Sequence, residues 1–334
     1  MQRASYYTRE AENSVICQLC PHFCKLNPGD KGKCGVRINR EGDLYSDSYG
    51  KLSALHIDPI EKKPIYHFRP GKRILSIGSW GCNLSCSFCQ NHHISQVSAG
   101  NEVYEMFTPK DVVDRALLVS NNAGIAYTYN EPLVGFEFVM DTAMLAKEKG
   151  LKNVVVSNGY INPEPLEQLM EVTDAFNIDL KAYTNRFYKE VTDGTLKPVL
   201  KTIKAIARKQ IHLEITFLVI PGFNDDVEDF RNMLQWIREE AGDLTPLHIN
   251  RSFPHYRLLL APTPENTIEE FVEIAKDYLT FVYPGNISPV EDAQNTYCQG
   301  CGRLIISRKG YASKVVNADE QGYCNGCSFN VFKN

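Results

Sequence analysis

Several features that would place the chain in a specialised class are missing from its 334 residues. No run of about 18 apolar residues occurs, so we expect no membrane-spanning helix and no membrane partner. Residues 1–10 are polar and lack the apolar core of a signal peptide, which favours a cytoplasmic protein. The net charge of −4 gives no general attraction for polyanions, and no internal repeat is present. With 43% hydrophobic and 23% charged residues, the composition indicates a globular chain with one main domain and appendages.

Cysteine is the residue type that stands out, with eleven in the chain. The cysteines fall into three groups with none left over, within 17–34, 82–89 and 298–327. An odd total fits poorly with complete disulfide pairing. In a cytosolic protein, clustered C-x2-C pairs are more typical of metal sites.

The central group is the stretch around which the chain is organised. Residues 81–91 read Gly-Cys-Asn-Leu-Ser-Cys-Ser-Phe-Cys-Gln-Asn, which spaces Cys82, Cys86 and Cys89 as C-x3-C-x2-C. Thiolates are the preferred ligands of iron–sulfur clusters, and three of them leave one iron of a [4Fe–4S] cluster open. An open position is the mark of a catalytic metal site, because a small molecule can bind there. The alternatives are a zinc loop or a disulfide fragment.

The first group lies in a predicted N-terminal segment, residues 1–72. Cys17, Cys20, Cys24 and Cys34, with glycines between them, indicate a metal knuckle. The spacing does not separate zinc from an iron–sulfur cluster, so a structural staple and an auxiliary redox cluster both remain open. His22 is not expected to be a ligand, because four cysteines complete a tetrahedral set.

Residues 58–70, which end this segment, are dense in proline and charge. They have no clear hydrophobic period. They fit either a loop that crosses over the central site or a linker with solvated charges.

From residue 73 to 295 the chain alternates between strand and helix patterns. The strands are expected at 74–80, 124–129, 153–157, 175–180, 212–220 and 247–251. The helices are expected at 108–120, 184–190, 196–209, 227–240 and 267–279, and a further helix follows residue 132 and ends at residue 149. Six βα units imply a parallel α/β sheet with right-handed crossovers, too short to close an eight-stranded barrel. We therefore predict a partial (β/α)6 barrel of the TIM type, with its site at the C-terminal strand ends.

Polar residues follow these strands where each one ends. They are Asn130, Glu131, Ser157, Asn158, Asp179 and Lys181, with His248 and Arg251 on the sixth strand. Because the C-terminal ends of parallel strands meet at one edge, we expect these residues to share a pocket with the cysteine loop. Alternatively, Asp179 and Lys181 form an ordinary ion pair, and His248 and Arg251 are ordinary loop residues.

The third group lies in a predicted C-terminal segment, residues 296–334. Cys298, Cys301, Cys324 and Cys327 form two C-x2-C pairs close to zinc-ribbon spacing. So short a segment with little apolar content needs a metal to fold, and we favour zinc or a single iron over an iron–sulfur cluster. A nucleic-acid partner is not favoured, because the basic residues have no interleaved aromatic residues.

Residues 81–224 resemble the pyruvate formate-lyase activating enzyme branch of the radical S-adenosylmethionine (SAM) superfamily. The motifs are the cysteine loop with Phe88 before its third cysteine, Asn130-Glu131-Pro132, Asp179-Leu180-Lys181 and Val219-Ile220-Pro221-Gly222. The branch has Gly-Gly-Glu-Pro where this chain has Tyr129 and Asn130 before Glu131. From about residue 15 to 330, the cysteine-rich ends and Asp58-Pro-Ile-Glu-Lys-Lys-Pro are similar to the AmmeMemoRadiSam-system radical SAM enzymes.

The resemblance implies a [4Fe–4S] cluster and SAM as cofactors, with reductive SAM cleavage to a 5′-deoxyadenosyl radical that abstracts hydrogen from a substrate. It implies cofactor contacts from Phe88, Gln90 and the strand-end residues above, and an electron donor such as flavodoxin or ferredoxin. We favour a small-molecule or modification reaction over activation of a partner glycyl radical enzyme. The hypothesis of another class is a non-catalytic redox metalloprotein, which would have a fully ligated cluster and no SAM binding.

Overall fold

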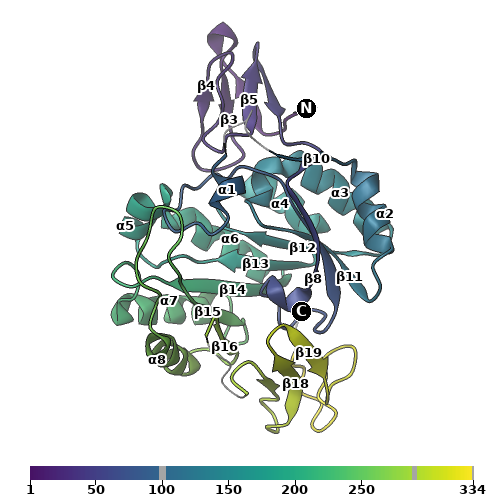
Figure 1. Ribbon diagram of the computed structural model, residues 1–334, viewed down its shortest axis with the longest axis vertical. Helices are drawn as coiled ribbons and strands as arrows, with labels where there is room; N and C mark the ends of the chain where they lie inside the picture. The colour runs from purple at the N-terminus through teal and green to yellow at the C-terminus, as the bar shows by residue number, and fades with distance from the viewer. Residues whose placement is uncertain (98–102, 288–291, 333–334) are drawn as a thin grey trace.

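A computed structural model describes residues 1–97, 103–287 and 292–332 of the chain (Figure 1). Its centre is an eight-stranded sheet in which seven neighbouring strands run parallel and the edge strand β8 runs antiparallel to β9. From edge to edge the strands are β8 (Ala54–Pro59), β9 (Arg73–Gly78), β11 (Asn122–Tyr127), β12 (Lys152–Ser157), β13 (Ala175–Asp179), β14 (His212–Val219), β15 (Leu247–Arg251) and β16 (Val282–Gly285). The predicted α/β partial barrel is confirmed, with more strands than expected.

Six helices cover one face of the sheet. They are α2 (Pro109–Leu117), α3 (Phe136–Glu148), α4 (Pro163–Val172), α6 (Leu196–Arg208), α7 (Val227–Glu240) and α8 (Glu265–Lys276). Alternate strand residues pack beneath them: the ring of Phe217 lies 5.4 Å from that of Phe230 and 6.4 Å from that of Phe271. Fully burying one such side chain contributes about 1.5–3 kcal/mol, so this layer holds the strands in place.

The six predicted strands correspond to β9 and β11 through β15. Helix α2 begins as predicted, because the Thr108 side chain accepts from the Asp111 amide and Asp111 accepts from the Thr108 amide. Within the main sheet and the helices that cover it, three elements were not predicted: β8, α4 and β16. Strand β16 is only four residues long and contains Pro284, which cannot donate a ladder hydrogen bond.

Residues 60–70 cross the inner face of the sheet. Ile60, Ile65 and Phe68 are buried in one cluster with Ala126 and other strand residues. The segment is therefore buried and is not a solvated linker, but it crosses toward the N-terminal ends of the strands and not over the cysteine loop, as one alternative had it. The prediction of an independent segment 1–72 stays a prediction, although β8 within it belongs to the main sheet.

The crossing segment is fixed by a carboxylate inside the barrel. Glu214 accepts from the backbone amides of Tyr66 and His67 at 2.8 and 2.7 Å. The imidazoles of His212 and His248 lie 2.9 and 2.6 Å from its oxygens. These contacts close the N-terminal ends of the strands, on the side opposite to the cysteine loop.

Two small lobes lie at opposite ends of the molecule (Figure 1). The N-terminal lobe contains β1 (Gln2–Arg3), β2 (Tyr7–Arg9), β3 (Val15–Cys17), β4 (Lys25–Leu26), β5 (Arg37–Arg40) and β6 (Asp43–Ser46). The C-terminal lobe contains β17 (Thr296–Tyr297), β18 (Leu304–Lys309) and β19 (Ala312–Val315). The remaining elements are short: β7 (Lys51–Leu52), β10 (Glu105–Met106), α1 (His92–Ser95), α5 (Asn185–Phe187) and the turns η1 (Ala11–Asn13), η2 (Ile60–Lys62), η3 (Pro132–Gly135) and η4 (Tyr188–Thr192). None of the helices described is long and apolar enough to cross a membrane.

Candidate active site and metal centres

The cysteine loop begins directly after β9 and is tied to the end of β11. The Asn130 side chain accepts from the Ser79 amide at 2.9 Å and donates to the carbonyls of Trp80 and Gly81 at 3.0 Å each. Gly81 has a φ of +86°, a conformation that favours glycine. A Cβ placed there would lie 2.5 Å from the Cys34 carbonyl oxygen. The loop is thus held by both the sheet and the N-terminal lobe.

The three cysteines of the loop differ in exposure: Cys86 is buried, whereas Cys82 and Cys89 are partly exposed. The sulfur of Cys82 accepts from the Leu84 amide at 3.4 Å, and that of Cys89 lies 3.0 Å from the Ser95 hydroxyl. Burial raises the pKa of the Cys82 thiol well above its usual range and that of Cys86 to about 11. A bound metal would lower the pKa of these thiols again, because ligation favours the thiolate over the thiol. Three soft donors on one loop therefore fit a cluster that needs thiolate ligands.

Glu131 connects the ends of β11 and β12 to this loop. Its Oε1 accepts from the Ser157 hydroxyl at 2.8 Å and the Leu133 amide at 3.1 Å, and its Oε2 accepts from the Asn158 amide at 2.8 Å. Burial raises the pKa of Glu131 to about 7, and these hydrogen bonds oppose the rise. The Asn158 side chain in turn donates to the sulfur of Cys82 at 3.6 Å. The structure thus brings three predicted strand-end residues against the cysteine loop.

Asp179 and Lys181 lie beside Cys86 at the end of β13. Their side chains form an ion pair of 2.9 Å, and the ammonium of Lys181 lies 5.8 Å from the centre of the Phe88 ring. Burial opposes the charge of Lys181, but Asp179 and the sulfur of Cys86 raise its pKa above the usual value. Lys181 therefore stays cationic, which suits an anionic group bound at this edge.

Three predicted residues have their main contacts elsewhere. His248, the second residue of β15, is buried against Glu214 and the ring of Tyr66, whose centre lies 4.6 Å away. Arg251 donates to the Thr263 carbonyl at 2.5 Å and is therefore held by its own loop. Gln90 follows Cys89 and is exposed. Contact between these three and a cofactor stays a prediction.

A cavity of about 670 Å³ opens next to the cysteine loop and was not predicted. It is lined by Ser53, Ala54, His56, Ile57, Asp58, Lys62, Trp80, Asn91, His93, Ile94, Val97, Val103 and Tyr129. The Tyr129 hydroxyl donates to Asp58 at 2.5 Å, and the buried ammonium of Lys63 donates to the same carboxylate at 2.6 Å. Tyr129 has a φ of +73°, so it adopts the backbone conformation of a glycine at this position. The sequence signal nearest to it was residues 58–70, which were expected to be a crossing loop or a solvated linker and not the wall of a cavity.

A loop after β15 reaches across to the cysteine loop. The Arg257 amide donates to the Ser87 carbonyl at 3.0 Å, and Tyr256 stacks on His92 with ring centres 4.6 Å apart. This strap, residues 252–264, therefore contacts the chain at the cysteine loop and at the helix α1 that follows it.

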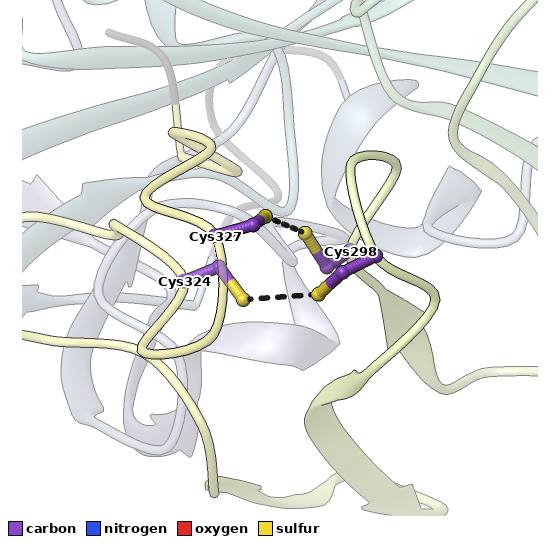
Figure 2. Close-up of side chains that lie close together, drawn as sticks. Cys298, Cys324 and Cys327 are labelled. Atoms are coloured by element: carbon purple, nitrogen blue, oxygen red, sulfur yellow. Dashed lines mark hydrogen bonds between the residues drawn. The ribbon is translucent and has the colours of Figure 1, made fainter.

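The four cysteines of the C-terminal lobe lie together, and Figure 2 shows the sulfur atoms of its labelled cysteines turned toward one another. All four sulfurs lie within 4.8 Å of one another, with 3.4 Å between Cys298 and Cys327 and 3.6 Å between Cys301 and Cys324. Tetrahedral bonds of about 2.3 Å to one zinc would place thiolates roughly 3.8 Å apart. The donor set therefore fits a single metal ion.

Comparisons with known proteins identify a family model, curated relatives and a shared fold. The model of the radical SAM superfamily matches residues 77–237. The chain is 42% identical to the uncharacterized protein MJ0808 of Methanocaldococcus jannaschii over 98% of both chains. It is 26% identical to pyruvate formate-lyase 1-activating enzyme of Escherichia coli, over 54% of this chain and 75% of that protein. A radical SAM methyltransferase structure from Sphaerobacter thermophilus shares the fold with a TM-score of 0.51 and 13% identity, over 70% of this chain and 71% of that chain.

Proposed function

The chain belongs to the radical SAM superfamily, and from that premise we propose that Cys82, Cys86 and Cys89 hold its catalytic [4Fe–4S] cluster. Members of this superfamily are enzymes that use such a cluster together with SAM. When bound, the cluster supplies one electron to the sulfonium of SAM, which yields methionine and a radical able to abstract hydrogen. The observation that supports the ligand assignment is the position of the three thiols at the C-terminal end of β9, where the site of a βα barrel lies.

The strand-end residues would then hold SAM beside the cluster. Glu131 would accept from the SAM ammonium, and the three donors that hold its carboxylate beside Asn158 support this role. Lys181 is placed to pair with the SAM carboxylate, because it remains cationic next to Cys86. Asp179, Ser157 and Asn158 offer hydrogen bonds to the ribose hydroxyls. These contacts orient SAM before the electron transfer.

The substrate is a small molecule that enters the cavity beside β8. A volume of about 670 Å³ lies within the usual range for small-ligand sites, about 300–1,000 Å³. Trp80 and Asn91, which flank the cysteine loop, line the cavity together with the polar side chains of His56 and Asp58. The cavity therefore places a polar molecule next to the radical source.

A second candidate is activation of a partner enzyme by hydrogen abstraction from a peptide loop. The similarity to pyruvate formate-lyase 1-activating enzyme supports it. So do the apolar side chains exposed on the strap, where Leu259 is 78% exposed and Phe253 and Leu260 are 38% exposed. Exposed apolar groups at the rim of a site favour a protein partner.

We also propose a subfamily, an electron donor, a location in the cell and a metal for the C-terminal lobe. The motifs at residues 17–34 and 58–64, with the paired C-terminal cysteines, support membership of the AmmeMemoRadiSam-system enzymes. We propose a low-potential flavodoxin or ferredoxin as electron donor, a cytoplasmic location, and zinc or a single iron in the C-terminal lobe.

Iron and sulfide analysis of anaerobically purified protein, followed by a reductive SAM cleavage assay, tests the assignment. We expect 5′-deoxyadenosine from the native protein and none from Cys82→Ala, Cys86→Ala or Cys89→Ala. Cys301→Ser is the matched control and should retain cleavage. Cleavage that persists in all three loop variants would refute the ligand assignment.

Substrate class is tested by adding either the ultrafiltrate or the protein fraction of a cell extract to the same assay. A small-molecule substrate predicts that the ultrafiltrate stimulates 5′-deoxyadenosine formation, and that His56→Ala weakens the stimulation but not the basal rate. His255→Ala, on the strap, serves as the matched control. Stimulation by the protein fraction alone would favour the activase.

A further inference from the structure

The N-terminal cysteines lie in a different environment from the C-terminal ones. Cys17 is buried, and Cys20, Cys24 and Cys34 are partly exposed. The Cys17 amide donates to the Cys24 carbonyl at 2.9 Å, so residues 17–24 turn back on themselves and bring three of these cysteines together. The charge of the Cys34 sulfur would affect those of Cys17 and Cys20, so it belongs to the same group. Among the described residues, however, it is the C-terminal four whose sulfurs all approach within 4.8 Å. A cubane cluster holds its thiolates farther apart than a single metal ion does, because each thiolate binds a different iron.

Backbone amides are directed at the sulfurs of this N-terminal group. The backbone amides of Leu19, His22 and Val36 lower the pKa of the Cys17, Cys20 and Cys34 thiols, in opposition to burial, which raises each pKa. An amide-to-sulfur hydrogen bond from two residues further along occurs at Cys82 and Cys324. Such bonds stabilise a thiolate over a thiol, so the lobe is built to hold charged sulfur.

A buried cation next to the group lacks partners for two of its nitrogens. Arg37 is 1% exposed; its Nη2 donates to the Ser5 carbonyl and to Glu137, but its Nε and Nη1 have no partner. A Cβ added to Gly32 would lie 3.6 Å from the Cys34 sulfur and 3.8 Å from the Arg37 Cβ, so the two side chains leave the same turn side by side. Leaving a buried charged donor unpaired destabilises the folded state, because the donor has lost its water and gained no acceptor. An anionic cluster on the cysteines would provide the missing acceptors.

The N-terminal group also contacts the catalytic loop directly. The His22 imidazole lies 2.6 Å from the Asn83 carbonyl, and the Cys34 carbonyl lies against Gly81. Since Gly81 precedes Cys82 and consecutive Cα atoms are about 3.8 Å apart, the Cα atoms of Cys34 and Cys82 lie within roughly 10 Å of each other. Two cofactors held at these residues would be neighbours.

We propose that Cys17, Cys20, Cys24 and Cys34 bind a second [4Fe–4S] cluster that delivers the electron used at the three-cysteine loop. A low-potential flavodoxin or ferredoxin gives one electron to the N-terminal cluster, which returns to its oxidised form by reducing the catalytic cluster. One donor is oxidised for each SAM cleaved. This relay rests on the proposed function, whereas the second cluster itself does not.

The decisive sample is the variant Cys82→Ala/Cys86→Ala/Cys89→Ala, purified and reconstituted anaerobically. We expect about four irons and four sulfides per chain to remain, with an electron paramagnetic resonance signal that SAM does not alter. Iron–sulfur content would thus be retained even if the native protein failed to cleave SAM, which separates this inference from the proposed function. Zinc without sulfide in this variant would overturn the second cluster.

The relay is tested in the converse variant, Cys17→Ala/Cys20→Ala, with its secondary structure checked by circular dichroism. We expect flavodoxin-driven SAM cleavage to fall roughly tenfold or more, while dithionite-driven cleavage persists. An unchanged flavodoxin-driven rate would overturn the relay.

Arg37→Lys is a milder test, because the double cysteine variant removes ligands and could unfold. Lysine keeps the positive charge but has fewer hydrogen-bond donors than arginine. We therefore expect full iron content and a lowered reduction potential of the N-terminal cluster. An unchanged potential would overturn the role of Arg37, and Cys301→Ser should leave the potential unchanged.

Discussion

Replacing Glu131 with glutamine tests the SAM site with the smallest change in shape. The amide keeps one acceptor for Ser157 and Leu133 but turns a donor toward the Asn158 amide, where Oε2 now accepts at 2.8 Å. Leaving that amide unpaired should cost about 1–3 kcal/mol of stability. The charge that would receive the SAM ammonium is lost as well.

A hydrogen bond to a charged group contributes about 1.5–3 kcal/mol, so we expect Glu131→Gln to weaken SAM binding roughly ten- to hundredfold. Calorimetry on the cluster-loaded protein measures this, with iron content measured on the same sample. Glu167→Gln, exposed on α4, is the matched control and should bind SAM normally. An unchanged SAM affinity in Glu131→Gln would remove this residue from the site.

Three further predictions concern stability. Gly81→Ala should disorder the cysteine loop and lower cluster content, because the added Cβ meets the Cys34 carbonyl at 2.5 Å; normal iron content would contradict this. Burial would raise the pKa of Asp58, but Lys63 and its other donors hold that pKa below the usual value. The stabilisation from Asp58 is therefore complete above about pH 4 and is lost as the pH falls further. Asp58→Asn should reduce this loss of unfolding free energy at low pH, as measured by urea titrations. Chelator treatment or Cys298→Ser should open the C-terminal lobe to protease, and unchanged cleavage would show that no metal holds it.

The strand–helix alternation and the cysteine loop were predictable because both depend on local pattern. The Thr108 cap and the β9–β15 order needed no tertiary information. Strand β8 was not predicted, because its pattern is mixed with proline and charge and its register is set by β9 alone. Helix α4 was missed although Pro163 marks its first turn.

The site was predicted in part for the same reason. Glu131, Ser157 and Asn158 meet because each ends a parallel strand, which the sequence pattern reveals. His248 lies nearer the start of its strand, so its contact with Glu214 depends on a register that the pattern did not give. The cavity was not predictable, because the Asp58–Tyr129 pair joins residues 71 positions apart on different strands.

The contacts between residues 66–67 and the C-terminal lobe, at the N-terminal ends of the barrel strands, limit the order in which the protein can fold. The Arg308 guanidinium donates to the Tyr66 carbonyl across 242 positions, and the His67 imidazole contacts the Val331 carbonyl across 264. Contacts so distant in sequence form slowly, since loop closure must precede them. During synthesis on the ribosome, Tyr66 and His67 lack these two partners until Arg308 and Val331 have emerged. A chain stopped before residue 296 would therefore leave an aromatic surface open at the base of the barrel, where it would be prone to aggregate or to be held by a chaperone.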